Sequence, residues 1–151
     1  MLALTFQVGA DRVAVDVRRV HEVVPRVRLA PVSGAPAWIA GVFVYHGRVV
    51  HVIDLHQLFR AGSCPMHLSS RIILVPRPGD AAGSLVGLLA TQVAEIRAVS
   101  APPQADRDAD RSELGAATPD GEGILRILDA DKLLERVARE SGGLLAAGPG
   151  S

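Results

Sequence analysis

The sequence has very little cysteine, no net charge and no long apolar run, and each shortage excludes a class of protein. The one cysteine, Cys64, excludes an internal disulfide framework and a cysteine-based zinc site. The 16 basic residues balance 16 acidic ones, which is unlike the basic surface of a nucleic-acid-binding protein. No apolar run approaches the roughly 18–20 residues of a membrane helix, and the N-terminus has no basic segment followed by a signal-length apolar run. We therefore expect a soluble, cytoplasmic protein without nucleic-acid binding or direct membrane insertion.

What is present is a globular composition. The chain has 151 residues, of which 48% are hydrophobic and 21% charged. This length corresponds to about one ordinary domain, and a chain of this size can bury a real core without disulfides. The hydrophobic fraction is too high for a disordered protein.

Short strand patterns dominate the chain. Apolar residues alternate with polar ones, or form brief continuous runs, between turn residues, as in half-buried and fully buried strands. The predicted strands cover residues 4–8, 13–17, 27–29, 41–45, 48–53, 71–75, 85–89, 93–99, 114–117 and 124–128. Two short helices are expected at residues 54–59 and 129–139, each capped at its start by an aspartate. Residues 100–112 form a polar, proline-rich loop in this prediction.

The chain repeats itself. Asp54, with the apolar strand before it and the helix after it, aligns with Asp129, 75 residues later, and Glu22 aligns with Glu95. Each half holds about five short strands, and closure into a small barrel removes the exposed sheet edges. We therefore predict a mainly all-β domain over residues 1–140. It comprises two tandem five-stranded barrels of about residues 1–70 and 71–140, with chain crossovers between them allowed, a C-terminal helix and a flexible tail at 141–151.

A group of polar side chains offers an enzymatic alternative. His46, His51, Asp54 and His56 lie within eleven residues, and histidine and aspartate can bind zinc or non-haem iron. The spacing opposes one shared ion, because His46 at a hairpin tip lies about 16 Å along the strand from His51. Asp54 also recurs as Asp129 without any histidine nearby, which favours a capping role. We expect no catalytic residue, cofactor or metal, and a metal-dependent hydrolase is the less favoured alternative.

Three stretches, residues 20–24, 41–55 and 86–96, resemble the chemotaxis coupling-protein (CheW-like) family, and the likeness extends in order over roughly residues 3–138. The resemblance implies two SH3-like barrels and a non-enzymatic adaptor. Such an adaptor bridges a methyl-accepting chemoreceptor-like protein, in arrays at the membrane, to the regulatory domain of a CheA-type histidine kinase. It further implies a set of partner-binding residues: Val20, Glu22, Gly41, His46, Val93 and Ile96.

The chain departs from the family pattern at one hairpin. The family usually has Asn-x-Arg-Gly there, whereas this sequence reads Val44-Tyr45-His46-Gly47. Because the missing arginine is commonly implicated in receptor contact, we expect a divergent coupling protein of an accessory, non-flagellar pathway. A self-associating barrel module that binds no kinase stays open as an alternative.

Overall fold

The structure, a computed structural model, describes residues 1–60, 62, 64, 70–79, 83–99, 114–120 and 123–141. The predicted loop at 100–112 and the predicted tail after residue 141 lie outside these residues. Within the described part no helix is both long and apolar enough to cross a membrane.

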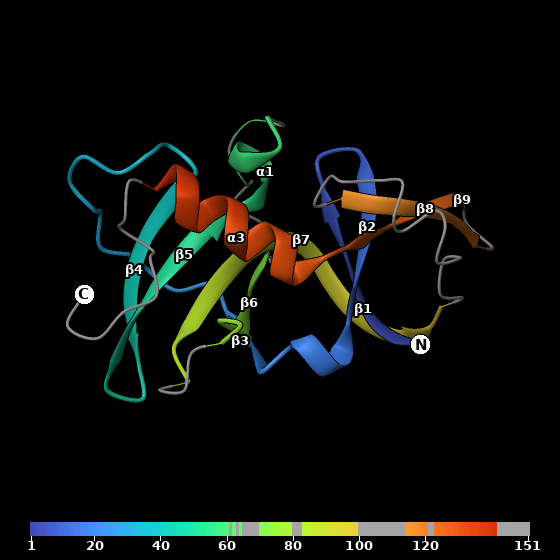
Figure 1. Ribbon diagram of the computed structural model, residues 1–151, viewed down its shortest axis with the longest axis horizontal. Helices are drawn as coiled ribbons and strands as arrows, with labels where there is room; N and C mark the ends of the chain where they lie inside the picture. Colours follow the sequence, from blue (N-terminus) through green and yellow to red (C-terminus); the bar gives the residue numbers. More distant parts are fainter. Residues whose placement is uncertain are drawn as a thin grey trace.

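Nine strands and three short helical segments fall within the described residues (Figure 1). The strands are β1 (Leu2–Val8), β2 (Asp11–Asp16), β3 (Glu22–Pro25), β4 (Ile39–Tyr45), β5 (Arg48–Asp54), β6 (Arg71–Pro76), β7 (Leu85–Ala98), β8 (Leu114–Asp120) and β9 (Gly123–Leu128). The helical segments are the 3-10 turn η1 (Val17–Arg19), α1 (Leu55–Leu58) and α3 (Ala130–Glu140). The mainly β fold with a C-terminal helix is confirmed.

One predicted strand is absent, and two others are joined. Residues 27–29 form no strand, and the segment is paired only by a bridge in which Ala30 and Val42 exchange hydrogen bonds of 2.8 Å. Flanking prolines explain this, because they cannot donate to a ladder. Residues 85–89 and 93–98 belong to the single strand β7, which ends one residue before the second predicted strand does. Between them Gln92 has a φ of 50°, and the pairing with β1 shifts register nearby, so the sequence pattern marked a bulge.

The strand β7 belongs to two groups of strands. Its first half pairs antiparallel with β6 and parallel with β5, whereas its second half pairs antiparallel with β1. Barrel 1 therefore contains β3, β4, β5, β6 and the start of β7, and barrel 2 contains β1, β2, β8, β9 and the end of β7. These are the two small SH3-like barrels that the sequence predicts, side by side in Figure 1.

The barrels exchange hairpins between the two sequence repeats. The hairpin β1–β2 from the first repeat joins barrel 2, and the segment from β6 to the start of β7 from the second repeat joins barrel 1. With this exchange, the strand pairings of the two barrels correspond. In barrel 2, β2 runs parallel to β9, and in barrel 1, β7 runs parallel to β5; each of β9 and β5 leads into a helix. A division at residue 70 would leave neither barrel whole. Parallel strands must be joined by a crossover connection. The crossovers of this chain therefore determine which strands share a barrel.

The helix α3 lies over the junction of the two barrels, in front of β5, β6 and β7 in Figure 1. Its buried face packs in the main core with side chains from both barrels. That face consists of Ala130, Leu133, Leu134 and Val137. Residues from both repeats, such as Phe6 and Ile53, belong to the same cluster. The helix therefore contributes to the core that joins the barrels.

The two aspartate caps are present but differ in depth. The buried carboxylate of Asp54 accepts from the backbone N–H groups of His56, at 2.9 Å, and Gln57, and also from Cys64 N–H at 2.9 Å. Asp129 is exposed and accepts from Lys132 N–H at 3.1 Å. Both caps are confirmed, and Asp54 additionally fixes the chain ten residues further on.

Removal of the two carboxylates should therefore have unequal effects. We expect Asp54→Ala to lower the free energy of unfolding by about 2–4 kcal/mol, because buried N–H groups lose their acceptor. Asp129→Ala, the matched control, should lower it by about 0.5–1 kcal/mol. Urea denaturation of both variants measures the difference, and equal losses would contradict the additional role of Asp54.

Candidate functional site

A surface hollow lies beside the tip of the β4–β5 hairpin. Its volume is about 430 Å³, and Tyr45 is one of the residues that line it. The Tyr45 ring meets the rings of His21 and His46 edge-on, with centroids 6.2 and 4.3 Å away. The hollow is lined by His21, Tyr45, His46, Arg48, Pro76, Gly83 and Leu85. Aromatic and basic groups thus gather where the hairpin meets the turn between β6 and β7.

Glu22 belongs to the same neighbourhood. The first residue of β3 is exposed, and its carboxylate accepts a hydrogen bond from the Tyr45 hydroxyl. Partial burial and this bond raise the pKa of Tyr45, so the phenol stays protonated and can keep donating. Arg48 Nη1 is 3.5 Å from the carbonyl oxygen of Gly83. The rim of the hollow therefore carries both an acid and a base, as at the polar edge of a protein interface.

The hairpin turn presents its side chains to solvent. His46 and Gly47 have φ angles of 48° and 78°, and positive values at both positions match the twist of a two-residue hairpin. Next to the turn, Val44 and Val49 are cross-strand partners, and their side chains are 68% and 63% exposed. The hairpin therefore offers an apolar pair bordered by the polar hollow.

Five of the six predicted partner-binding residues lie in three environments. Glu22 and His46 are exposed and both contact Tyr45, so these two are brought together. Val20 and Val93 are half-buried and pack against the main core. Ile96, on the barrel 2 half of β7 opposite Leu4, is 60% exposed. Tyr45 was not among the predicted residues, because only the fold shows that it touches both Glu22 and His46.

The histidine set of the hydrolase alternative is not assembled. His46 is exposed at the hairpin turn, and His51 pairs with Val86 inside barrel 1. Burial and the charge of Arg77 lower the pKa of His51. Among the described residues, the ligand-type side chains that converge are Asp54, His56 and Cys64. Cys64 was not in the set considered from the sequence, since spacing alone does not reveal which loop residue folds back onto a cap.

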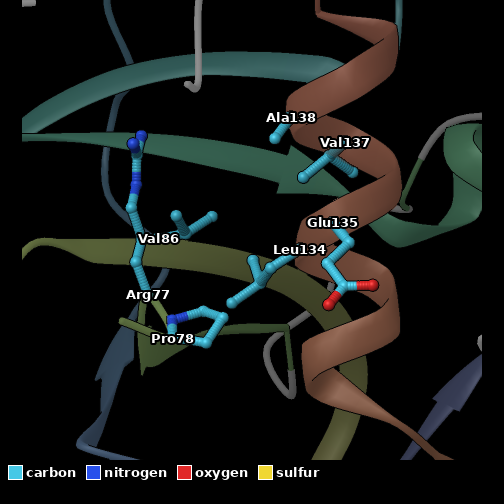
Figure 2. A pocket seen from close by; sticks show the side chains of 7 residues that line it. All are labelled: Arg77, Pro78, Val86, Leu134, Glu135, Val137 and Ala138. Carbon is cyan, nitrogen blue, oxygen red and sulfur yellow. The ribbon is translucent and has the colours of Figure 1, made fainter. Parts of the chain in front are cut away.

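A second hollow lies between α3 and the end of β6. Figure 2 shows Leu134 and Val137 of α3 on one side and Val86 and Pro78 on the other. The hollow has a volume of about 130 Å³ and is completed by Arg77, Glu135 and Ala138. This is well below the roughly 300–1,000 Å³ of small-molecule sites, so we assign no cofactor there.

Comparison with known proteins decides the family. The CheW-like domain family model matches residues 2–138, nearly the whole chain. The chain belongs to the CheW-like domain family. The Chemotaxis protein CheW of Treponema pallidum (strain Nichols) is 26% identical over 140 residues, covering 86% of this chain and 79% of that protein. The scaffolding protein TtCheW from Thermoanaerobacter tengcongensis has a similar fold, with a TM-score of 0.73 and 21% identity over 88% of this chain and 86% of that one. The protein is thus a coupling adaptor of chemotaxis signalling.

Within this CheW-like domain, Gly41 lies inside the protein. It is buried in β4 with a φ of 146°, and an added Cβ would lie 2.6 Å from the carbonyl oxygen of Ala30 and 2.8 Å from the Cβ of Leu29. Even the smallest side chain would therefore displace the segment before β4. Any influence of Gly41 on a partner is exerted through the position of this hairpin.

Substitution of two glycines in this hairpin should distinguish the effect of steric crowding on stability from that of a positive φ alone. Gly41→Ala should lower the free energy of unfolding by about 3 kcal/mol, from crowding and an unfavourable φ. Gly47→Ala, where an added Cβ meets nothing within 4 Å, should lose only about 1 kcal/mol from its positive φ. Thermal and urea denaturation measure both. A fully stable Gly41→Ala variant would show that the close approach to Ala30 is not a constraint.

Proposed function

We propose that the protein is a non-enzymatic adaptor that joins a chemoreceptor-like protein to the regulatory domain of a CheA-type histidine kinase. Membership of the CheW-like domain family supports partners of this kind in general. The observation that carries the proposal is the separation of two exposed apolar sites on one continuous sheet, one on the barrel 1 hairpin and one on the barrel 2 half of β7. An adaptor needs two such surfaces, whereas an enzyme needs a converging set of reactive groups.

The hairpin surface is assigned to the receptor. Val44 and Val49 supply the apolar centre, and the hollow with Tyr45 and His46 supplies a polar rim that can orient a partner helix. His46 occupies the position where the family usually has arginine. This difference supports a receptor of altered chemistry, in keeping with an accessory pathway.

The β7 surface is assigned to the kinase. Ile96 projects from barrel 2, and on the neighbouring strand Leu2 is also exposed. Val93, on the same strand, is half-buried and packs on the main core, so this surface is continuous with a rigid interior. A regulatory domain built from the same type of barrel could bury such a patch in a barrel-to-barrel contact.

Substitution of an exposed residue tests the surface assigned to the kinase. Ile96→Asp should weaken binding of the kinase regulatory domain by about tenfold or more, because a carboxylate would be desolvated in the interface. Ile124→Asp is the matched control, since Ile124 is 67% exposed on β9 and lies outside the predicted set. Isothermal titration calorimetry with the kinase domain from the same organism measures both. Equal weakening by the two variants, or by neither, would contradict the assignment.

Restoring the family residue tests the receptor surface. His46→Arg should leave kinase affinity within about twofold while changing receptor binding, because the substituted side chain lies at the hairpin tip of barrel 1 and not on the barrel 2 half of β7. Pull-down of receptor cytoplasmic fragments and of the kinase domain, with the same variant, gives both measurements. Equal loss of both partners would indicate damage to the hairpin, and the assignment would fail.

Self-association is the competing function. The exposed Val44–Val49 pair could also meet a second copy of the chain, as apolar surface on a molecule with no net charge favours association. Light scattering of the pure protein with and without the kinase domain distinguishes the two. Rings or dimers that exclude the kinase would favour a self-associating module over the adaptor.

A further inference from the structure

Three chemically different donors meet at the start of α1. The carboxylate of Asp54, the imidazole of His56 and the thiol of Cys64 are all buried, and one ligand atom from each lies within 4.8 Å of the others. The first two are fixed by the end of β5 and the first turn of α1. Cys64 is fixed by its own N–H, which donates to Asp54 Oδ2 at 2.9 Å. Backbone contacts therefore fix the positions from which these three side chains project.

One atom of this group is unsatisfied. His56 Nδ1 has no hydrogen-bond partner although its side chain is only 4% exposed. It points at Asp54 Oδ1 from 3.9 Å, which is too long for a hydrogen bond. A buried nitrogen left without a hydrogen-bond partner destabilises the fold, so a partner is expected.

The spacing suits a metal ion. Zinc binds nitrogen and oxygen at about 2.0–2.2 Å and sulfur at about 2.3 Å, so tetrahedral neighbours lie roughly 3.3–3.6 Å apart. The 3.9 Å between His56 Nδ1 and Asp54 Oδ1 exceeds such an edge by a few tenths of an ångström, within the reach of small rotamer changes. The combination of nitrogen, oxygen and sulfur donors selects a zinc-type ion over magnesium or calcium, which prefer oxygen alone.

We propose that Asp54, His56 and Cys64 bind one zinc-type divalent cation in a structural site. These residues line neither of the two hollows described above. It differs from the hydrolase alternative in its ligands and in its role, and it differs from the multi-cysteine zinc sites that the composition excludes because it has a single thiolate ligand.

The charges at the site balance when the ion is bound. One carboxylate and one thiolate neutralise a dication, which matters because an unbalanced charge in the interior is unfavourable. His56 Nδ1 has no hydrogen-bond partner among the described residues, so it is available to bind an ion. Asp54 can keep its backbone hydrogen bonds, since Oδ2 accepts only from Cys64 N–H and has a further lone pair, whereas Oδ1 already accepts from His56 and Gln57.

Of the three ligands, the thiol of Cys64 is the one that must lose a proton before it binds the ion. Burial, followed by the charge of Asp54, raises the pKa of Cys64, so without an ion the sulfur carries its proton. Binding must break the S–H bond, form the metal–sulfur bond and release that proton to solvent. Arg26 Nη1 lies 3.8 Å from Sγ and lowers the cost of the thiolate.

We expect the bound ion to stabilise the segment that connects the two repeats. Cys64 packs in the barrel 1 cluster with Val50, Val52 and Leu89, ten residues after Asp54 and shortly before β6. An ion there would cross-link the cap of α1 to the segment that leads into the second repeat. Because the site requires the folded arrangement, bound metal should raise the melting temperature.

Cobalt titration tests the proposal on the whole chain, freed of any affinity tag, reduced with a phosphine and stripped of metal by chelator. We expect a thiolate-to-cobalt charge-transfer band that saturates at one Co²⁺ per chain and disappears when Zn²⁺ is added. Cys64 is the one cysteine of the sequence, so the band reports on this thiol without any variant. Zn²⁺ should also raise the melting temperature of the wild-type protein and protect Cys64 from alkylation.

Substitutions assign the other ligands. Cys64→Ser should abolish the band, and His56→Gln should weaken Co²⁺ binding about tenfold or more. His51→Gln is the matched control, a half-buried histidine of the same barrel outside the cluster, and should bind as wild type does. Absence of the band in the wild-type protein, a band that needs two chains per ion, or unchanged affinity in His56→Gln would each overturn the proposal. Loss of kinase binding with metal binding intact would instead count against the adaptor function alone.

Discussion

The pairing of β1 with the second half of β7 is the contact that ties the two repeats into one molecule. It places the first hairpin of the chain in the barrel built mostly by the second repeat. The complementary pairing of β6 with β3 places the opening strand of the second repeat in the barrel of the first. Neither repeat can complete its own sheet, so the core under α3 forms only when both are present. Long-range strand pairing of this kind carries a large entropic cost of closure, which the shared core must offset.

Local features of this fold could be predicted from the sequence because local chemistry determines them. Most of the strands, the His46–Gly47 turn and the two aspartate caps each depend on a few neighbouring residues, and these features are present. The grouping of strands into barrels could not be predicted in the same way. Equivalent hairpins have similar apolar patterns, and nothing within a hairpin specifies which copy it will pair with.

The candidate site shows the same division between local and distant information. Glu22 and His46 could be singled out by resemblance, but their common neighbour Tyr45 emerges only when β3 and β4 are placed in one barrel. Gly41 was expected at a partner surface, whereas it is buried against Ala30, because the residue type reports a backbone requirement and not exposure. Cys64 could not be connected to Asp54 from spacing, since its segment lacks a regular pattern.

The exchange of hairpins also bears on how such a chain could have arisen. Two separate copies of one repeat, each lending its first hairpin to the other, would contain every strand pairing described for the two barrels. That arrangement is a symmetric swapped homodimer, which is a common route by which small domains associate. Joining the copies end to end would then need only a linker between α1 and β6, after which each half could diverge and carry its own binding surface.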